Sequence, residues 1–432
     1  MRRTMAWAAA GVLTLSLLAT SPATATTGSF YDPPADLPAA NGELVRAEPM
    51  QLAASVSFGG SIAPLPGAAT RIMYRTTDMN GAPAAASGVY IEPTVRWRGD
   101  GERPLVAFAA GTQGQGDACA PSKTLESGLV VESGAVAVGY EIPSIYGLLA
   151  RGIAVVVTDY IGLGTTDRDH SYVVRLDSGH AVLDAARAAD DVPGASVTAS
   201  SPIGLFGYSQ GGGAVASAAE LAATYAPELP IKGTFAGAPP ADLAAVLRSA
   251  DGTSLTGVIG WALNGLAQYD AEFAAAVTPE LNEKGVSTLE ALKAACIGDA
   301  IITSGTAFNK TSSWTTSGES LSQLAARLPA VRDSLAEQRI GTMLPNAPVQ
   351  ILTGTKDDIV AHPQAKQLAS DWCAQGVAVT YVPVIQPVGS GGTGLNHLAP
   401  MITRAALSQQ WLVDRLEGDR TSGNCSSLRW LP

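Results

Sequence analysis

The sequence predicts an α/β fold, a mostly parallel sheet flanked by helices, with a helical cap inserted between two parts of the core. Short runs rich in β-branched residues alternate with alanine-rich stretches of helical length, the pattern of strand–helix–strand units. Most of these runs are apolar throughout, as expected for strands buried on both faces. One long segment, residues 241–345, has helical patterns and no convincing strand, which indicates the insertion.

The chain opens with the features of a secretory signal peptide, which we place at residues 1–25. Arg2 and Arg3 form a positive start, an apolar run covers residues 6–19, and Ala23-Thr24-Ala25 is a small-x-small cleavage site. The alternative is a membrane anchor, but the apolar run is too short to span a bilayer. No later segment reaches about 18 uninterrupted apolar residues, so we expect a secreted, extracellular protein without a stable membrane anchor.

Composition and charge exclude several classes of protein. With 46% hydrophobic and 15% charged residues, the chain is unlike a disordered protein. The net charge is −11, and it becomes −13 when the two positive charges of Arg2 and Arg3 are removed. An acidic chain without basic clusters argues against a nucleic acid or an anionic membrane as its partner.

Cysteine usage fits a secreted protein. An even number of cysteines in a secreted chain predicts two disulfides, and from the residues alone all three pairings are open. The four cysteines are Cys119, Cys296, Cys373 and Cys425. No C-x-x-C pair occurs, so we expect neither a thiol-redox site nor a zinc site, and we expect no metal or other cofactor.

The first part of the core covers residues 26–240. It begins with a proline-rich, polar stretch at residues 30–49, which we expect to lie on the domain as an extended arm. Two strands, at 71–74 and 84–91, flank an Asn-Gly pair, a strong hairpin signal. Further strands are expected at 104–110, 153–158, 203–206 and 235–238, and helices at 179–190 and 212–225.

The cap, residues 241–345, and the second part of the core, 346–432, complete the chain. Within the cap, residues 255–266 either line an acyl pocket or form the interior of the cap itself. The stretch 389–394 matches G-x-G-x-x-G, but no helix clearly follows, so we expect a loop rather than a nucleotide site. Cap helices are expected within 255–273, 289–296 and 321–338, core strands at 349–353 and 377–384, and a core helix at 363–373.

The strongest functional signal is Gly207-Tyr208-Ser209-Gln210-Gly211, a G-x-S-x-G pentapeptide. It follows a strand-like run and precedes a helix of small residues, the context of the nucleophile elbow of the α/β-hydrolase fold. The elbow turns sharply, and glycines two residues either side of the serine avoid a collision across the turn. The start of the following helix also places positive potential beside the developing oxyanion. Ser209 is therefore the candidate nucleophile.

A serine nucleophile needs a base, and the sequence has four histidines. In this fold the order along the chain is Ser, then Asp or Glu, then His, which leaves His362 and His397. His397 is favoured because it lies in a loop after the last strand-like run, whereas His362 follows the strand where the acid is expected. We expect His170 and His180 to be structural or surface residues.

The acid is expected after the penultimate strand, in Gly354-Thr355-Lys356-Asp357-Asp358-Ile359-Val360. The G-x-x-D-x-x-V pattern selects Asp357, and Asp358 is the alternative. Its role would be to orient the imidazole and stabilise its charged form. Either aspartate could instead simply form the turn.

An oxyanion hole needs two aimed backbone N–H groups. One is expected from Gln210, the residue after the nucleophile, and the other from Thr112 or Gln113 in the loop after an early core strand. Alternatively, that loop is only a tight turn.

With these residues in place, the chain resembles the Candida antarctica lipase A-like secretory lipase family, and its bacterial members in particular. Besides the elbow, the resemblance rests on Phe30-Tyr31-Asp32-Pro33-Pro34, Cys119-Ala120-Pro121-Ser122 and Asp159-Tyr160-Ile161-Gly162-Leu163-Gly164. It implies an α/β-hydrolase core, a helical cap over the acyl-binding cleft and metal-free ester hydrolysis.

The same resemblance maps the family's triad onto Ser209, Asp357 and His397. It implies that Cys119 pairs with Cys296, which would tie the cap to the oxyanion loop, and that Cys373 pairs with Cys425. Lipase A carries an aspartate in its oxyanion loop where this chain has Gly114, a departure from the pattern.

The predicted function is a secreted serine ester hydrolase, a triacylglycerol lipase or carboxylesterase of lipid catabolism that works through an acyl-enzyme on Ser209. Its expected partner is an ester or lipid substrate, with transient contact at a lipid interface. The alternatives are a secreted peptidase or acyltransferase with the same triad, and an inactive hydrolase-like binding protein. Chain-length preference and oligomeric state are left open.

Overall fold

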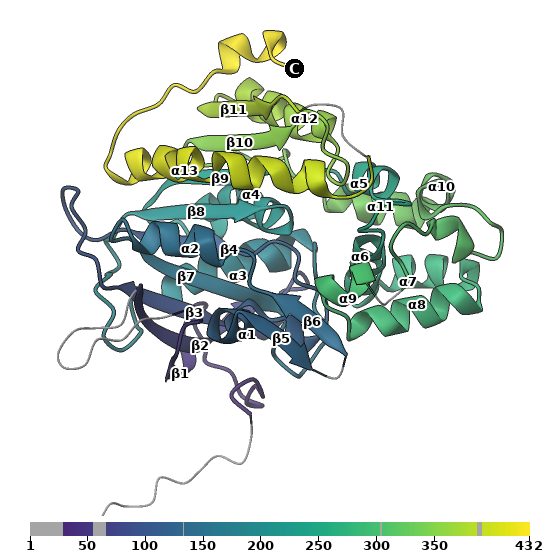
Figure 1. Cartoon of the computed structure of the whole chain (residues 1–432), viewed down its shortest axis with the longest axis horizontal. Helices are drawn as coiled ribbons and strands as arrows, with labels where there is room; N and C mark the ends of the chain where they lie inside the picture. The colour runs from purple at the N-terminus through teal and green to yellow at the C-terminus, as the bar shows by residue number, and fades with distance from the viewer. Residues whose placement is uncertain (1–28, 55–65, 133, 303–304, 387–390) are drawn as a thin grey trace, which may run out of the picture.

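The computed structural model describes residues 29–54, 66–132, 134–302, 305–386 and 391–432 (Figure 1). The expected signal peptide, residues 1–25, lies outside these ranges. Among the described helices, none combines the length and hydropathy needed to cross a bilayer.

The core is a mixed sheet whose larger part is parallel. Within the described ranges, nine strands pair in the order β1-β2-β3-β7-β4-β8-β9-β10-β11. β1, β2, β3 and β7 pair antiparallel, and the ladder from β7 to β11 is parallel. The strands are β1 (Leu44–Met50), β2 (Gly67–Thr77), β3 (Pro83–Pro93), β4 (Leu105–Ala109), β7 (Ala154–Ile161), β8 (Ile203–Tyr208), β9 (Ile231–Gly237), β10 (Val349–Gly354) and β11 (Val379–Val384).

Helices cover both faces of this sheet (Figure 1). One apolar cluster joins the sheet to α3 (Arg175–Ala188), α4 (Gln210–Tyr225) and α12 (His362–Ala374). A second cluster, on the opposite face, contains α2 (Ile142–Leu149) and α13 (Leu395–Leu416). Every residue of β4, β7, β8 and β10 is buried, which confirms the expectation drawn from their apolar sequences.

Two parts of the sheet structure differ from the sequence prediction. The expected extended arm at 30–49 ends in β1, an edge strand that pairs with β2. Its charged residues and Pro49 suit an exposed edge but hide the strand from a search for apolar runs. A separate hairpin of β5 (Leu129–Glu132) and β6 (Ala135–Val138) was also not predicted, since its strands are short.

The segment between β9 and β10 is helical, as predicted. In Figure 1 its helices gather beside one end of the sheet. They enclose an apolar cluster of their own that includes Trp261, Phe273 and Trp314, all fully buried. The helices are α5 (Leu243–Ser249), α6 (Gly257–Ala267), α7 (Ala271–Val277), α8 (Glu283–Lys293), α9 (Ile297–Ile302), α10 (Leu321–Arg327) and α11 (Pro329–Glu337).

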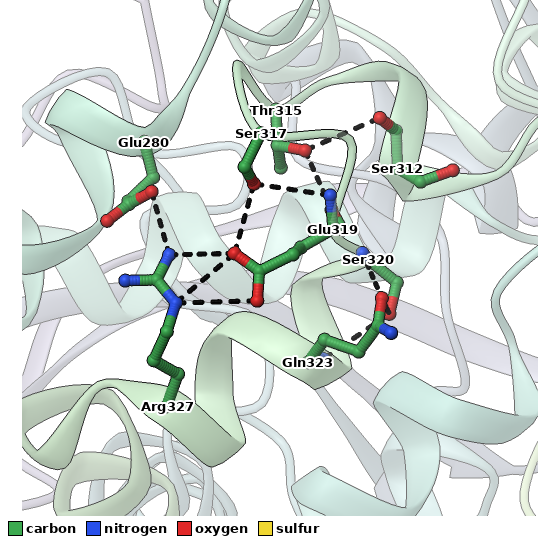
Figure 2. A network of polar contacts seen from close by, with 8 residues as sticks. All are labelled: Glu280, Ser312, Thr315, Ser317, Glu319, Ser320, Gln323 and Arg327. Atoms are coloured by element: carbon green, nitrogen blue, oxygen red, sulfur yellow. Dashed lines mark hydrogen bonds and ion pairs between the residues drawn. The ribbon is translucent and has the colours of Figure 1, made fainter.

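Polar contacts set where α10 begins and what it faces (Figure 2). Ser320 and Gln323 form a capping box at its start. At its end, Arg327 donates hydrogen bonds at 2.9 Å to both Glu280 and Glu319. Arg327 is exposed and the two glutamates are half-buried, so the network fixes the position of the helix more than it adds stability.

Two disulfides link distant parts of the chain. Cys119 bonds Cys296, which joins the loop after β4 to the start of α9, and Cys373 bonds Cys425, which joins α12 to the C-terminal segment. These are the pairings that the family resemblance implied.

Candidate active site

Ser209 lies at the sharp turn between β8 and α4. Its backbone has φ 58° and ψ −123°, a strained conformation for a residue with a side chain. A Cβ on Gly207 would lie 2.2 Å from the carbonyl oxygen of Gly211, and one on Gly211 would lie 2.0 Å from that of Ala109. Both flanking glycines are therefore required sterically, as the pentapeptide predicted.

The structure brings together the three side chains predicted for the triad. His397 Nε2 lies 2.8 Å from Ser209 Oγ, and His397 Nδ1 lies 2.8 Å from Asp357 Oδ2 and 3.0 Å from Oδ1. Because Nδ1 faces a carboxylate, it carries the ring proton, and Nε2 is free to accept the Ser209 hydroxyl proton. The His397 and Asp357 side chains are almost completely buried.

The neighbouring aspartates contact different parts of His397. Asp357 holds the ring, and its Oδ1 also accepts the N–H groups of Ile359 and Val360. Asp358 instead accepts the backbone N–H groups of Gly394 and His397, at 3.0 and 3.2 Å. Asp357 thus orients the imidazole of His397, and Asp358 holds the backbone that carries this side chain.

The sequence predicted that His397 lies in a loop. In the structure it lies in the first turn of α13. Gly394 is the residue before the helix, and the helix continues through Pro400. A proline leaves the carbonyl four residues earlier without its helical donor. Here that carbonyl, of Asn396, accepts a hydrogen bond from the Gln386 side chain at 2.5 Å.

The glycine-rich stretch 389–394 is followed directly by this helix, contrary to the prediction; residues 389 and 390 lie outside the described ranges. The helix start does not resemble a phosphate site, because the Asp358 carboxylate already accepts its N–H groups. What argues against a nucleotide site here is therefore the Asp358 carboxylate at the start of the helix, and not the lack of a helix.

The loop after β4 lies against the elbow. Gly111 and Thr112 line the same cavity as Ser209 and Gln210, whereas Gln113 does not. The carbonyl of Gln113 accepts the N–H of Ile297 at 2.7 Å, which ties this residue to α9. Of the two predicted donors, Thr112 is therefore the one that lies on the wall of the cavity with Ser209.

At Gly114 the chain departs from the family pattern, which has an aspartate there. Neighbouring atoms leave no room for a side chain at this position. Gly114 has φ +134°, and a Cβ there would lie 2.4 Å from the Ala295 oxygen, 2.5 Å from Cys296 Cα and 2.8 Å from Cys119 Sγ. No aspartate fits at this position, because the loop packs directly against the disulfide.

Two contacts to the oxyanion loop and the elbow were not predicted. Glu141 is buried in the cavity, and both its oxygens accept the N–H of Gly111 at 3.1 Å. Burial raises the pKa of Glu141 to about 8, and the Gly111 hydrogen bond offsets part of the shift. No sequence pattern marks this residue, since its role depends on how α2 packs.

The second contact that was not predicted is made by His170, which was expected to be a structural or surface residue. It is fully buried, and its Nδ1 donates to the Ile161 carbonyl at 2.9 Å. Its Nε2 accepts from the Gln210 side chain at 3.0 Å, so it holds the residue after the nucleophile. Burial lowers the pKa of His170 to about 4, which keeps it neutral in this role.

The other two histidines form hydrogen bonds outside the triad. His180 stacks on Tyr225 with ring centroids 3.8 Å apart, and its Nδ1 bonds the Thr77 carbonyl. His362 contacts the Tyr381 hydroxyl at 3.2 Å.

A cavity of about 680 Å³ leads from Ser209 into the helical segment. Its walls are mainly aliphatic, as expected of a site for an apolar ligand. From residues 255–266 it takes Leu255, Val258, Ile259, Ala262, Leu263 and Leu266. Several of these also belong to the apolar cluster of the segment, so the stretch lines the cavity and also forms part of the interior of the segment.

The motifs that carried the resemblance meet at one buried carboxylate. Asp159 accepts hydrogen bonds from the Ser87 and Ser122 hydroxyls at 2.7 and 2.6 Å, and Ser122 also contacts the Tyr31 hydroxyl at 2.8 Å. These contacts join the N-terminal arm, β3, β7 and the short helix α1 (Pro121–Ser127) that follows Cys119. The motifs therefore support the scaffold around the site.

Comparison with known proteins places the chain among lipases. The model of the secretory lipase family matches residues 127–424. The chain is 30% identical over 410 residues to the probable inactive lipase MT1628 of Mycobacterium tuberculosis, covering 93% of this chain and 84% of the relative. It is 26% identical over 399 residues to the secreted triacylglycerol lipase LIP7 of Malassezia globosa, covering 92% and 80%.

Solved structures share the fold. The closed state of Candida antarctica lipase A superposes with a TM-score of 0.73 at 21% identity, covering 91% of this chain and 86% of that one. The rice cell wall degrading esterase LipA of Xanthomonas oryzae superposes with a TM-score of 0.72 at 18% identity, covering 88% and 100%.

Proposed function

The chain belongs to the secretory lipase family, and we propose that it is an extracellular serine ester hydrolase that cleaves carboxylic esters of lipids, triacylglycerols among them. One observation carries the proposal. The hydrogen-bonded series Ser209–His397–Asp357 stands at the wall of a deep aliphatic cavity, so an activated hydroxyl meets a space suited to an acyl chain.

The proposed reaction has two steps. Ser209 Oγ attacks the ester carbonyl carbon while His397 Nε2 takes the hydroxyl proton, and Asp357 stabilises the imidazolium. The N–H groups of Gln210 and Thr112 hold the tetrahedral oxyanion. Its collapse breaks the ester C–O bond, and His397 returns the proton to the departing alcohol. Water then attacks the acyl-enzyme by the same route and releases the acid.

The division of the chain also remains a proposal. We assign residues 26–240 and 346–432 to the hydrolase core and 241–345 to a cap over the acyl-binding cavity. Support comes from the cavity walls, which combine the elbow with α5, α6, α7, α10 and α11. A transient contact with a lipid interface follows from this function, since aggregated lipids offer their esters at such a surface.

The decisive test is Ser209→Ala. We expect it to lower the turnover of p-nitrophenyl butyrate by at least about 10³-fold, because it removes the hydroxyl that His397 activates. Circular dichroism and the melting temperature show whether the fold is kept. The matched control is Ser287→Ala on α8, whose exposed hydroxyl bonds only the Lys284 carbonyl among the described residues. Retained turnover in Ser209→Ala would refute the assignment.

Two alternatives have their own tests. A peptidase or acyltransferase would prefer peptide bonds or an added alcohol acceptor, so rates with ester, peptide and ester plus alcohol separate these activities. The relative named as probably inactive raises the second alternative, a binding protein of the same fold. Labelling by a fluorophosphonate probe that is lost in Ser209→Ala would exclude it.

A further inference from the structure

A short segment between β7 and α3, His170-Ser171-Tyr172, lies close to the nucleophile elbow. All three residues are buried, with exposed fractions of 0, 1 and 4%. Tyr172 has φ 55°, a left-handed backbone conformation that is uncommon for a bulky residue. Strain of this kind persists only where the surrounding structure fixes it, and it is concentrated at functional sites.

The two ends of this segment contact the two residues proposed to stabilise the oxyanion. His170 Nε2 accepts a hydrogen bond from the Gln210 side chain at 3.0 Å. The Tyr172 hydroxyl lies 2.8 Å from Thr112 Oγ1, so these two hydroxyls share a hydrogen bond. Two residues of one short segment thus hold both sides of the proposed oxyanion hole.

The rings of His170 and Tyr172 are themselves fixed by their neighbours. His170 Nδ1 donates to the Ile161 carbonyl, which leaves Nε2 as an acceptor, and the ring stacks on Tyr160 with centroids 5.7 Å apart. The Tyr172 ring packs edge-on against His170 and against Trp261 of α6, with centroids 6.0 and 5.8 Å apart. Rings locked in this way hold their hydrogen-bond partners in a narrow range of positions.

The segment is also anchored to α6. A Cβ on Gly265 would lie 2.3 Å from the Ser171 carbonyl oxygen, so the two backbones are in direct contact. Gln115 Nε2 donates to the His170 carbonyl at 2.7 Å, and Gln115 Oε1 accepts from Asn264 of α6 at 2.9 Å. Because α6 also lines the cavity, the acyl-binding space and the proposed oxyanion hole share one support.

We propose that His170 and Tyr172 are positioning residues that together clamp the oxyanion hole. His170 fixes the backbone N–H of Gln210 by holding the side chain of that residue. Tyr172 fixes the backbone N–H of Thr112 in the same way. This inference rests on the proposed function. Since the oxyanion is absent from the bound ester and forms only during the reaction, the clamp raises kcat and leaves ester binding unchanged.

Tyr172→Phe tests one side of the clamp, because it removes only the hydroxyl. Active sites are counted by titration with a fluorophosphonate. Per active site, we expect kcat for p-nitrophenyl butyrate to fall at least about fivefold while KM stays within about twofold. The matched control is Tyr74→Phe. Tyr74 is fully buried, its hydroxyl lies 2.6 Å from Thr158 Oγ1, and it does not line the cavity, so this variant should keep the wild-type kcat.

Two variants of His170 separate positioning from packing. Both lose the bond to the Ile161 carbonyl, but His170→Gln keeps a strong acceptor at the place of Nε2, whereas His170→Met has the same length without one. We expect His170→Met to lower kcat at least about tenfold and His170→Gln to restore at least about a third of the wild-type value. Equal losses in the two variants would show that His170 only fills space, and would overturn its role.

Binding of butylboronic acid tests the clamp without turnover. The boron bonds Ser209 Oγ and places an oxygen in the oxyanion hole, as a transition-state analogue does. In Tyr172→Phe and His170→Met, we expect Kd from calorimetry to rise by about the factor by which kcat falls. An unchanged Kd, or an equal rise in Tyr74→Phe, would overturn the proposal. If the wild type binds the boronic acid but cleaves no ester, the proposed function fails, and the comparison of Kd values still decides whether the clamp acts.

Discussion

Glu141 is a titratable group of the cavity that the three-residue mechanism does not use. It holds the N–H of Gly111, next to the proposed donor Thr112, and its pKa of about 8 keeps it largely protonated at neutral pH. As the pH rises through 8, the carboxyl loses its proton and becomes negative. A negative charge beside a developing oxyanion raises the barrier, so the active form is the protonated one.

We therefore expect kcat for p-nitrophenyl butyrate to fall as the pH rises through about 8. Glu141→Gln keeps an oxygen to accept the Gly111 N–H but cannot ionise, so its kcat should stay level over the same range. Glu272→Gln, at an exposed position on α7, is the control and should keep the wild-type profile. An identical alkaline loss in wild type and Glu141→Gln would contradict this role.

At the residue scale, the sequence suffices to select Ser209, Asp357 and His397, because a strand–turn–helix pentapeptide and the order along the chain leave few choices. It does not reveal that Asp358 holds the start of α13, since this contact depends on where that helix begins. Glu141 and His170 were not found because their contacts come from packing between elements distant in sequence.

At the scale of elements, the loop from Gly111 to Gly114 is confined by what packs behind it. Gly114 has the disulfide and the backbone before α9 within contact distance. A side chain at this position would push the loop away from that support and move Thr112, a few residues earlier.

Gly114→Ala should lower the free energy of unfolding by about 1–3 kcal/mol and also reduce kcat, because the proposed oxyanion donor is displaced. Gly194→Ala is the control: Gly194 also has a positive φ, +85°, but nothing lies within 4 Å of its added Cβ. Urea unfolding and ester turnover measure both effects. If the two variants lose equal stability and both keep wild-type kcat, the loop is not supported in this way.

Elements with a strong local pattern were predicted and the others were not. The Asn-Gly hairpin and the buried strands of the sheet follow from turn chemistry and apolar runs. β1 was not predicted because an edge strand carries polar residues, and the start of α13 was hidden by Gly394 and Pro400. In the case of Pro400, the compensating donor is Gln386, from another part of the chain.

At the scale of the whole molecule, the helical segment and the core together shape the substrate space. The cavity runs from the elbow past α6, whose Ala262 lies on its wall. A hydrophobic pocket distinguishes substrates by how much of the acyl chain it can bury, so cavity depth governs preference among chain lengths.

Ala262→Phe should shorten this space. We expect kcat/KM for p-nitrophenyl palmitate to fall at least about tenfold while that for p-nitrophenyl acetate is kept, since only the long chain reaches the blocked part. The control is Ala267→Phe, on the same helix at an exposed position that does not line the cavity. Equal loss on both esters would place the acyl chain elsewhere.

The existence of the helical segment was predictable, because a long run of helical patterns between strand runs has few other interpretations. Its depth and the path of its cavity were not. They depend on how seven short helices, counted within the described residues, pack against each other, and apolar spacing alone does not encode that arrangement.

The bond between Cys119 and Cys296 has a consequence for the cell that makes this protein. It joins the segment after β4, which includes the loop expected to stabilise the transition state, to the residue just before α9, a helix that lines the cavity. Disulfides of this kind form outside the reducing cytosol. A chain still inside its producer would therefore lack this bond, and the loop would gain its covalent link to the cavity wall only after export.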